Sequence, residues 1–204
     1  MKEIFILRHG ETDHNLKGIV QGSGINSVLN SNGLLQSKLF YDSHSNQNFD
    51  IFIHSNLIRT EQTIQHFLQY KTPRIIEERI REISWGEHEG KAGEPELMEK
   101  YYKIINAWQK GDYTAKPHNG ESAQELGNRL NSFLDDLEKM DFSKALICTH
   151  GRTLRAMICL FKKWPLSRME EVGHNNTGLY ILRKNNTEWT VVRENDLTHL
   201  ECLK

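Results

Sequence analysis

The chain has 204 residues, a length that suits one folded domain, and its hydrophobic fraction of 37%, counted without glycine, is ordinary for a globular protein. Its 26 basic and 27 acidic side chains leave a net charge of −1. This balance excludes a nucleic-acid or membrane-surface partner that is held by bulk charge, so a site for an anion has to be built locally.

The cysteine content and the apolar segments indicate the compartment. The three cysteines, Cys148, Cys159 and Cys202, form no CxxC pair and leave an odd count, so we expect no disulfide framework. The apolar residues 4–7 are too few for the hydrophobic part of a signal peptide. No segment approaches the roughly 20 apolar residues of a membrane span. These features predict a cytoplasmic protein.

Three short apolar runs, each typical of a strand buried on both faces, are followed directly by polar side chains. The runs are residues 4–7 before Arg8-His9, residues 51–53 before His54-Ser55, and residues 145–148 before Thr149-His150. In open α/β sheets, ligands bind at the carboxyl ends of the strands. We therefore expect these polar residues to lie at one edge of a sheet.

The stretches between these strands have the spacing of amphipathic helices. The predicted helices, in chain order, cover residues 33–41, 56–68, 122–137 and 151–161. Ser55 or Asn56 is expected to cap the second helix, and Ser122 with Glu125 fits a capping box at the third. Residues 179–183 and 189–193 predict a hairpin around Asn185-Asn186.

The alternation of strands and helices predicts an α/β fold with a mostly parallel sheet. We see no repeat or linker, so residues 1–204 are expected to form one domain. Residues 92–117 differ from the rest because they are helical in pattern and rich in lysine. We interpret them as a helical cap insertion that lies over the site. Within it, Tyr101, Tyr102 and Trp108 are expected to pack rather than to contact a substrate.

Motifs along nearly the whole chain resemble, in order, the blocks of the histidine phosphatase superfamily, also called the phosphoglycerate mutase-like family. They are Arg8-His9-Gly10-Glu11-Thr12 with Asn15; Gln21-Gly22, Leu29-Asn30, Gly33 and Gln36; Ser55, Leu57, Arg59, Gln62 and Thr63; Glu82, Gly86, Glu89 and Gly90; Gly120-Glu121-Ser122; Thr149-His150-Gly151 with Arg155; and Asn176. One Arg-His-Gly tripeptide is weak evidence, but the ordered set is specific. The resemblance implies a three-layer α/β/α fold.

The resemblance also implies a phosphatase that acts through a phosphorylated His9. Phosphoryl transfer needs a nucleophile in line with the leaving oxygen and cationic donors around the remaining oxygens. A neutral imidazole can form a phosphohistidine, provided that one ring nitrogen is unprotonated while the other donates to an acceptor. Arg8 and Arg59 are the predicted phosphate clamps, because a guanidinium matches phosphate geometry. The resemblance makes His150 a phosphate donor.

Glu82 is the predicted general acid, which protonates the leaving alkoxide and later activates water. Glu77 and Glu78, in the same charged run, are interpreted as solvated. The remaining predicted substrate contacts are Asn15, Gln21, Gly22 and the backbone N–H of Gly151 at a helix N-terminus. Arg152 departs from the usual pattern, and we hypothesise that it contacts a second anionic group of the substrate.

Other departures from the family pattern are Val28, Asn56 and Thr60, which stands where alanine is common. None of the three is expected to have a chemical role. A metal site built from His9, His14, His150 or His174 is disfavoured, because the chain has no metal-ligand motif and Arg8 would repel a cation. We therefore expect no metal and no cofactor.

Three functions are compatible with these motifs. They are a phosphatase, a phosphoglycerate mutase-type phosphotransferase and a non-catalytic binding protein. The short stretch between Gly90 and Gly120 favours hydrolysis, because the cofactor-dependent mutases usually carry a longer insertion there. The expected partner is a small phosphorylated metabolite such as a sugar phosphate, a phosphoglycerate or α-ribazole phosphate, with no nucleic acid and no membrane. A homodimer is left open.

Overall fold

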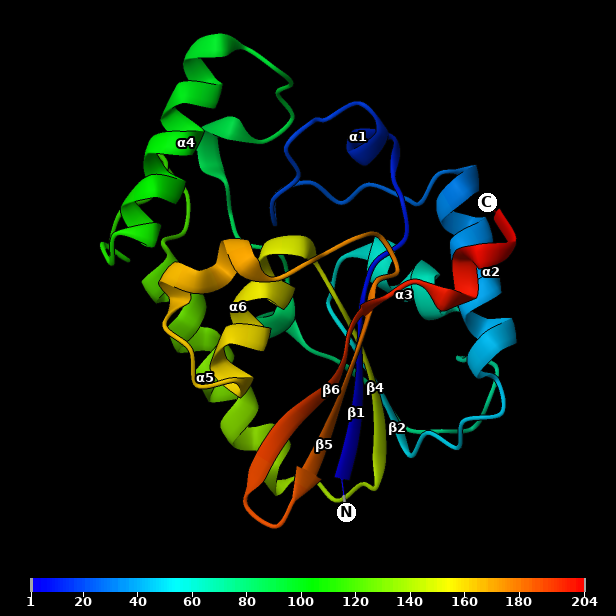
Figure 1. The fold of residues 1–204 in the computed structure, drawn as a ribbon. Coiled ribbons are helices and arrows are strands. Elements are labelled where there is room, and N and C mark those ends of the chain that lie inside the picture. Colours follow the sequence, from blue (N-terminus) through cyan, green and yellow to red (C-terminus); the bar gives the residue numbers. More distant parts are fainter. Residues whose placement is uncertain (1, 204) are drawn as a thin grey trace.

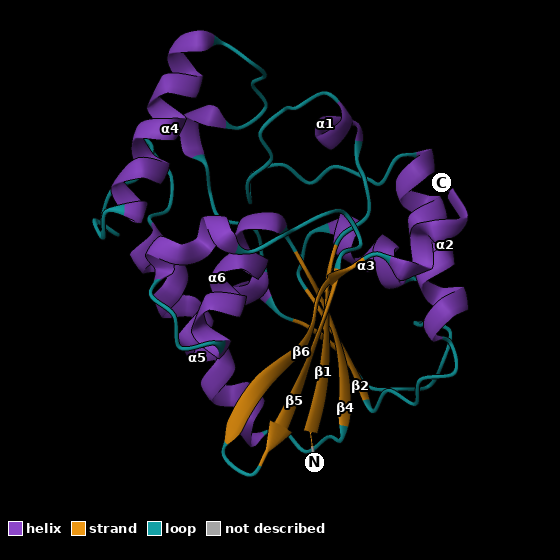
Figure 2. Ribbon diagram, viewed as in Figure 1, coloured by secondary structure: helices purple, strands orange, loops and turns teal. Residues whose placement is uncertain are grey.

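The structure, a computed structural model, describes residues 2–203, the last two by their backbone alone, and places a six-stranded sheet at the centre of the molecule (Figure 1, Figure 2). The strands are β1 (Lys2–Arg8), β2 (Ile51–His54), β3 (Arg74–Ile76), β4 (Lys144–Thr149), β5 (Leu179–Asn185) and β6 (Glu188–Asp196). Their order is β3-β2-β4-β1-β5-β6. The first four strands along the chain run parallel, and the β5–β6 hairpin is antiparallel at one edge. The predicted α/β fold is confirmed.

Helices cover both faces of this sheet, as the resemblance implied (Figure 1). One layer holds α5 (Ala123–Lys139) and α6 (Gly151–Phe161), and the other holds α2 (Ser31–His44) and α3 (Ile58–Ile64). The short α1 (Asp13–Leu16) and the cap helix α4 (Pro95–Gln109) lie beyond the carboxyl ends of the parallel strands. The 3-10 segments are η1 (Glu78–Ile80), η2 (Gly86–His88), η3 (Leu166–Glu171) and η4 (Thr198–Leu203). In the described part of the chain, no helix is long and apolar enough to cross a membrane.

The apolar run of β1 is uninterrupted because its side chains point alternately to two faces of the sheet that are both buried. Successive side chains of a strand point to opposite faces of the sheet. Ile4 and Ile6 are buried in the core beneath α5 and α6, whereas Phe5 and Leu7 are buried in the core beneath α2 and α3. Both faces are thus apolar along residues 4–7, and polar side chains return at Arg8, where β1 reaches the sheet edge.

Of the two predicted helix N-caps, one is confirmed and the other is wrong. The capping box at α5 is present, since Ser122 Oγ accepts from Glu125 N and the Glu125 carboxylate accepts from Ser122 N. In contrast, Leu57 is the N-cap of α3, so the prediction of Ser55 or Asn56 was wrong. The Ser55 hydroxyl is bonded to His150 and accepts from the N–H of Leu57, just before the helix. β3 was not predicted, because a three-residue edge strand with two exposed side chains gives no readable pattern.

Gly33, in the first turn of α2, permits a close approach between that helix and the backbone of Glu11, which follows β1. A Cβ at Gly33 would lie 2.1 Å from the backbone oxygen of Glu11. Backbone cannot move aside as a side chain can, so we expect Gly33→Ala to lower the free energy of unfolding by about 1–3 kcal/mol, as other overpacked sites do. Urea unfolding measures this change. Leu34→Ala, at an exposed position of the same helix, should change the stability by less than about 0.5 kcal/mol.

Candidate active site

Polar residues from three parallel strands meet at one edge of the sheet. Arg8 at the end of β1 is in register with Thr149 at the end of β4, and His54 at the end of β2 is in register with Cys148. His9 and His150, one residue past their strands, have ring centroids 5.2 Å apart. The strand pattern in the sequence therefore correctly predicted which residues lie together.

The orientation of His9 defines its reactive atom. Its Nδ1 lies 2.7 Å from the carbonyl oxygen of Gly10, and since a carbonyl only accepts, Nδ1 carries the proton. Nε2 therefore keeps its lone pair. Burial, with the nearby Arg59 and Arg8 charges, holds the pKa of His9 well below its usual value. His9 is thus a neutral imidazole with Nε2 as the free nucleophilic atom.

The backbone around His9 is fixed by neighbouring side chains. Asn176 Nδ2 donates to the carbonyl of His9 at 2.9 Å and to Asn15 Oδ1 at 3.2 Å. The Gly10 N–H donates to Thr63 Oγ1 at 2.9 Å. These bonds tie the histidine to α1, to α3 and to the loop before β5, so its ring direction follows from the fold.

Arg8 and Arg59 bring positive charge to His9. Arg59 is fully buried, and its Nη1 donates to the carbonyl of Ile25 at 2.6 Å, while Arg8 Nη1 donates to the carbonyl of His174 at 2.6 Å. Burial lowers the pKa of each guanidinium to about 10, so both stay charged at neutral pH. The two Nε atoms and His150 Nδ1 are buried and have no hydrogen-bond partner among the described residues.

Such orphaned buried nitrogens are rare, because leaving one unpaired costs about 1–3 kcal/mol or more. Three of them around the nucleophile are what a site built for an anionic ligand would contain. A phosphoryl group offers several acceptor oxygens to such donors.

Glu82 occupies the N-terminus of α6. Its Oε2 accepts from the N–H of Arg152 at 3.1 Å, and its Oε1 accepts from the N–H of Thr153 at 3.0 Å and of Ile83 at 3.0 Å. The carboxylate is almost buried, yet it borders the cavity in front of His9. The backbone N–H groups of Arg152 and Thr153, at the helix N-terminus that we expected to bind the substrate, thus bind Glu82, and Gly151 and Arg152 of that turn line the cavity.

This cavity has a volume of about 200 Å³. It is lined by Arg8, His9, Asn15, Gly18, Ile19, Val20, Gln21, Glu82, Trp85, Tyr101, Gly151, Arg152, Arg155 and His174. The lining includes Tyr101 from α4, so the cap helix does border the site. Trp108 is buried in the core and Tyr102 is exposed, away from the cavity lining.

Of the predicted substrate contacts Gln21 and Gly22, only Gln21 lines the cavity. Gln21 lines the cavity, and its Nε2 donates to Thr12 Oγ1 at 2.7 Å. Gly22 does not line it: a Cβ there would lie 1.9 Å from Glu89 Oε1, so the glycine makes room for that carboxylate. The carbonyl of Gly22 also accepts from Arg59 Nη2 at 3.5 Å, which places Gly22 behind the clamp rather than at the substrate.

A second cationic group borders the cavity around Arg152 and Arg155. Both guanidinium groups pair with the single carboxylate of Glu170, which leaves a net positive charge. Arg152 also donates to the Tyr101 hydroxyl at 3.2 Å and lies over the Trp85 ring, 5.7 Å from its centroid.

His174 contacts both Arg155, through its ring, and Arg8, through its backbone carbonyl. Its Nδ1 accepts from Arg155 Nη2 at 3.1 Å, and burial and the Arg8 charge lower the pKa of His174 to about 3. It is therefore neutral, with its proton on Nε2. Neither Glu170 nor His174 was predicted to be a phosphate-site residue. Proximity to Asn176 was the only signal for His174, and Glu170 lies in an ordinary charged run.

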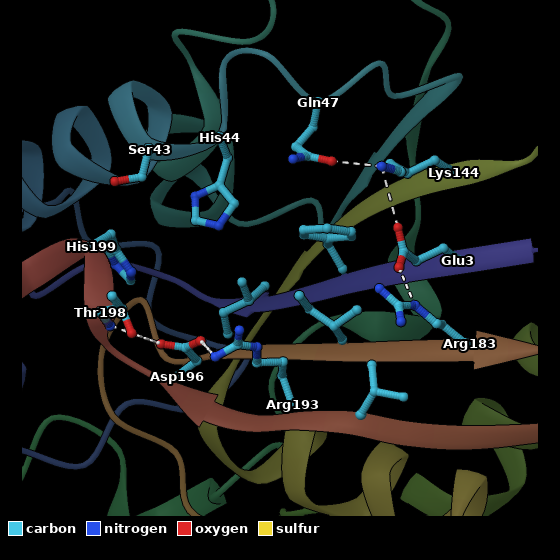
Figure 3. A pocket seen from close by; sticks show the side chains of 14 residues that line it. Glu3, Ser43, His44, Gln47, Lys144, Arg183, Arg193, Asp196, Thr198 and His199 are labelled. Atoms are coloured by element: carbon cyan, nitrogen blue, oxygen red, sulfur yellow. Dashed lines mark hydrogen bonds and ion pairs between the residues drawn. The ribbon is translucent and has the colours of Figure 1, made fainter.

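A larger cavity, of about 580 Å³, lies on the sheet face beside the C-terminal end of α2 (Figure 3). Its charges satisfy one another: Glu3 pairs with Lys144 and Arg183, and Arg193 pairs with Asp196. It has none of the orphaned nitrogens found around His9. Among the described residues, no group of three His, Cys, Asp or Glu side chains is arranged to hold a metal ion.

The fold and the site together define an α/β protein with a buried, neutral histidine beside an arginine-lined cavity suited to an anion. The chain belongs to the histidine phosphatase superfamily (branch 1), whose sequence model matches residues 4–197.

Individual relatives cover almost the whole chain. One relative, from Hydrogenobacter thermophilus, is 30% identical over 100% of both chains and is a candidate phosphoserine phosphatase. A second protein of the same organism, named phosphoserine phosphatase 1, is 28% identical over 98% of this chain and 95% of its own. A protein of Serratia proteamaculans named as a phosphoglycerate mutase is 28% identical over 98% and 96%. A phosphoserine phosphatase of Entamoeba histolytica, solved with phosphoserine, shares the fold with a TM-score of 0.83, 24% identity and 98% and 100% coverage.

Proposed function

We propose that the protein hydrolyses small phosphate monoesters, with His9 as the residue that becomes phosphorylated. The observation that carries this proposal is the state of His9: its proton is bonded to the Gly10 carbonyl, and two arginines whose charges act on its ring, Arg8 and Arg59, each have a buried Nε donor without a partner among the described residues. The named phosphatases among the relatives support it.

The reaction follows in two steps from these groups. His9 Nε2 attacks phosphorus while the ester oxygen leaves, and Glu82 supplies the proton that the leaving alkoxide takes up. Water then attacks the phosphohistidine, giving a proton back to Glu82, and free phosphate and neutral His9 result. Arg8, Arg59 and His150 stabilise the charge on the phosphoryl oxygens, each donor being worth about 10²–10³-fold in rate.

The proposed mechanism requires no metal ion. Arg8 and Arg59 supply the positive charge that a metal gives to other phosphoryl-transfer sites. They would also repel a cation from the position next to His9. We place the reaction in the cytoplasm, since Cys148 and Cys159 are free thiols and both are buried.

The shape and charge of the cavity favour a compact substrate with a second anionic group. A volume of about 200 Å³ is below the range of about 300–1,000 Å³ that holds drug-sized ligands. Arg152 and Arg155 add positive charge to the lining of the cavity. We therefore propose a short phosphorylated acid such as phosphoserine, with the carboxylate held on the Arg152 side. A phosphoglycerate mutase-type transfer is the second candidate, because one relative bears that name.

We expect the enzyme, assayed in chelator, to release phosphate faster from phosphoserine than from phosphoethanolamine, which lacks only the carboxylate. A charge-assisted hydrogen bond contributes about 1.5–3 kcal/mol, so the kcat/KM ratio should be about 10–100. Arg152→Ala should reduce this ratio more than it reduces the rate with phosphoethanolamine. The control is Arg168→Ala, which removes an exposed arginine paired with Glu171.

The outcomes separate the two parts of the proposal. An unaltered ratio in Arg152→Ala would contradict the role of Arg152 while leaving the phosphatase intact. Absence of phosphate release from a broad panel of monoesters would contradict the phosphatase itself. A 2,3-bisphosphoglycerate-dependent interconversion assay run in parallel measures the mutase alternative.

A further inference from the structure

The ring of His150 lies next to that of His9, and the position of its proton has to be assigned. The ring is fully buried next to His9, and its Nδ1 has no partner among the described residues, whereas Nε2 lies 2.6 Å from Ser55 Oγ. Burial, with the Arg59 charge and His9 nearby, holds the pKa of His150 well below its usual value. The ring is therefore neutral and carries one proton, and its position decides whether Nδ1 offers a donor or a lone pair.

The hydrogen bonds of Ser55 settle where that proton lies. The N–H of Leu57 donates to Ser55 Oγ at 3.1 Å. Thr60 Oγ1, 3.2 Å from Ser55 Oγ, lies closer to two carbonyl oxygens, of Leu57 at 2.8 Å and of Ser55 at 3.0 Å. Carbonyls only accept, so the single Thr60 proton is directed to them.

The proton of Ser55 then has one short partner. Its oxygen already accepts from Leu57, and Nε2 of His150 at 2.6 Å is nearer than Thr60 Oγ1 at 3.2 Å. An O–H donated to Nε2 requires a lone pair on that nitrogen. In a neutral ring the proton is then on Nδ1, the atom that has no partner.

We propose that Ser55, whose backbone carbonyl accepts from the Thr60 hydroxyl, is a positioning residue that fixes neutral His150 in the Nδ1–H tautomer, so that this N–H donates to the phosphoryl group. The inference rests on the phosphatase activity proposed above. Without the Ser55 hydroxyl, the ring can take the other tautomer and turn a lone pair toward the phosphoryl oxygens, which repels them. A wrong histidine tautomer costs about 10⁴-fold in a serine protease, which sets an upper limit.

Thr60 contributes to this arrangement through its hydroxyl group. It stands where the family commonly has alanine, and we expected it to have no chemical role. Its hydroxyl instead lies against both the hydroxyl and the carbonyl of Ser55. The proposal therefore includes Thr60, whose hydroxyl donates to the Ser55 carbonyl and so holds the backbone from which Ser55 reaches His150.

The test compares Ser55→Ala, Ser55→Thr and Thr60→Ala with Ser37→Ala. Ser37 is the matched control: it is fully buried and its hydroxyl also bonds to α3, at the carbonyl of Thr63, but it does not touch His150. We expect Ser55→Ala to lower kcat about 10–100-fold with a smaller change in KM, Thr60→Ala to lower it less, and Ser55→Thr to restore most of it. Ser37→Ala should leave kcat within about twofold.

Nitrogen-15 NMR of the histidine rings reads the tautomer directly, even in a variant that has no measurable turnover. We expect Nδ1–H on His150 in the unaltered protein and a mixture of tautomers in Ser55→Ala. A proton on Nε2 in the unaltered protein would overturn the inference, as would a Ser37→Ala variant that loses as much kcat as Ser55→Ala. If the unaltered protein releases no phosphate from any monoester, the proposed function fails, while the NMR result still decides the tautomer.

Discussion

Replacing His9 with alanine is expected to abolish phosphate release, lowering kcat by about 10⁴–10⁶-fold, the range that loss of a nucleophile costs in other covalent enzymes. The physical reason is that the site offers no second unprotonated nitrogen in the same place. His150 Nε2 is bonded to Ser55, and its Nδ1 carries the ring proton in the arrangement inferred above. His9→Ala should also remove the phosphorylated enzyme that rapid quenching traps, a species stable in base and labile in acid.

The matched control for this change is His118→Ala, because His118 is an exposed histidine outside the cavity. It should retain the full rate and the phosphorylated enzyme. All assays are run in chelator. Activity that survives in His9→Ala, or that appears only when Mg²⁺ is added, would contradict the phosphohistidine mechanism.

The sequence identified most of the residues that lie around the nucleophile, since three strands each end in polar side chains at one edge. His9 and His150 follow β1 and β4, which are adjacent and parallel. Arg59 was identified by resemblance, and the structure places it fully buried and close enough for its charge to lower the pKa of His9. The carboxyl ends of parallel strands meet at one edge, so this shared edge can be predicted, whereas the adjacency of β1 and β4 cannot be read from chain order, because β2 and β3 lie between them in the sequence.

Partners that depend on a side-chain direction could not be predicted. Ser55 was interpreted as a helix cap because serine before an amphipathic helix is a common cap. Only the three-dimensional path of β2 and β4 shows that its hydroxyl is committed to His150. The acceptor for His9 Nδ1, the carbonyl of Gly10, was likewise unreadable, because every residue has a carbonyl.

The charged run around Glu82 shows the same limit. Glu78 is exposed, as expected, but the expectation that Glu77 is solvated was wrong. Glu77 accepts from the N–H of Arg79 at 2.9 Å and forms an ion pair with its side chain, with only 11% of its own side chain exposed. Residue type alone does not separate a carboxylate that ends a turn from one that faces water.

Glu82→Gln provides the sharpest test of the acid, because its effect should depend on the leaving group. With an alkyl phosphate, the departing alkoxide needs a proton, so we expect kcat to fall about 10²–10⁴-fold. With an aryl phosphate that has an acidic phenol, the first step needs no proton and should be nearly as fast as in the unaltered protein. The second step still lacks its base, because glutamine cannot take a proton from water.

The Glu82→Gln variant should therefore release a burst of phenol equal to the enzyme concentration and then turn over slowly, with phosphorylated His9 accumulating. Stopped-flow absorbance and rapid quenching measure the two quantities. Glu78→Gln is the control, since that side chain is 67% exposed, and it should show neither effect. An equal loss on both substrates with no burst would mean that Glu82 only holds the first turn of α6 through Arg152 and Thr153, and that the proton comes from another group.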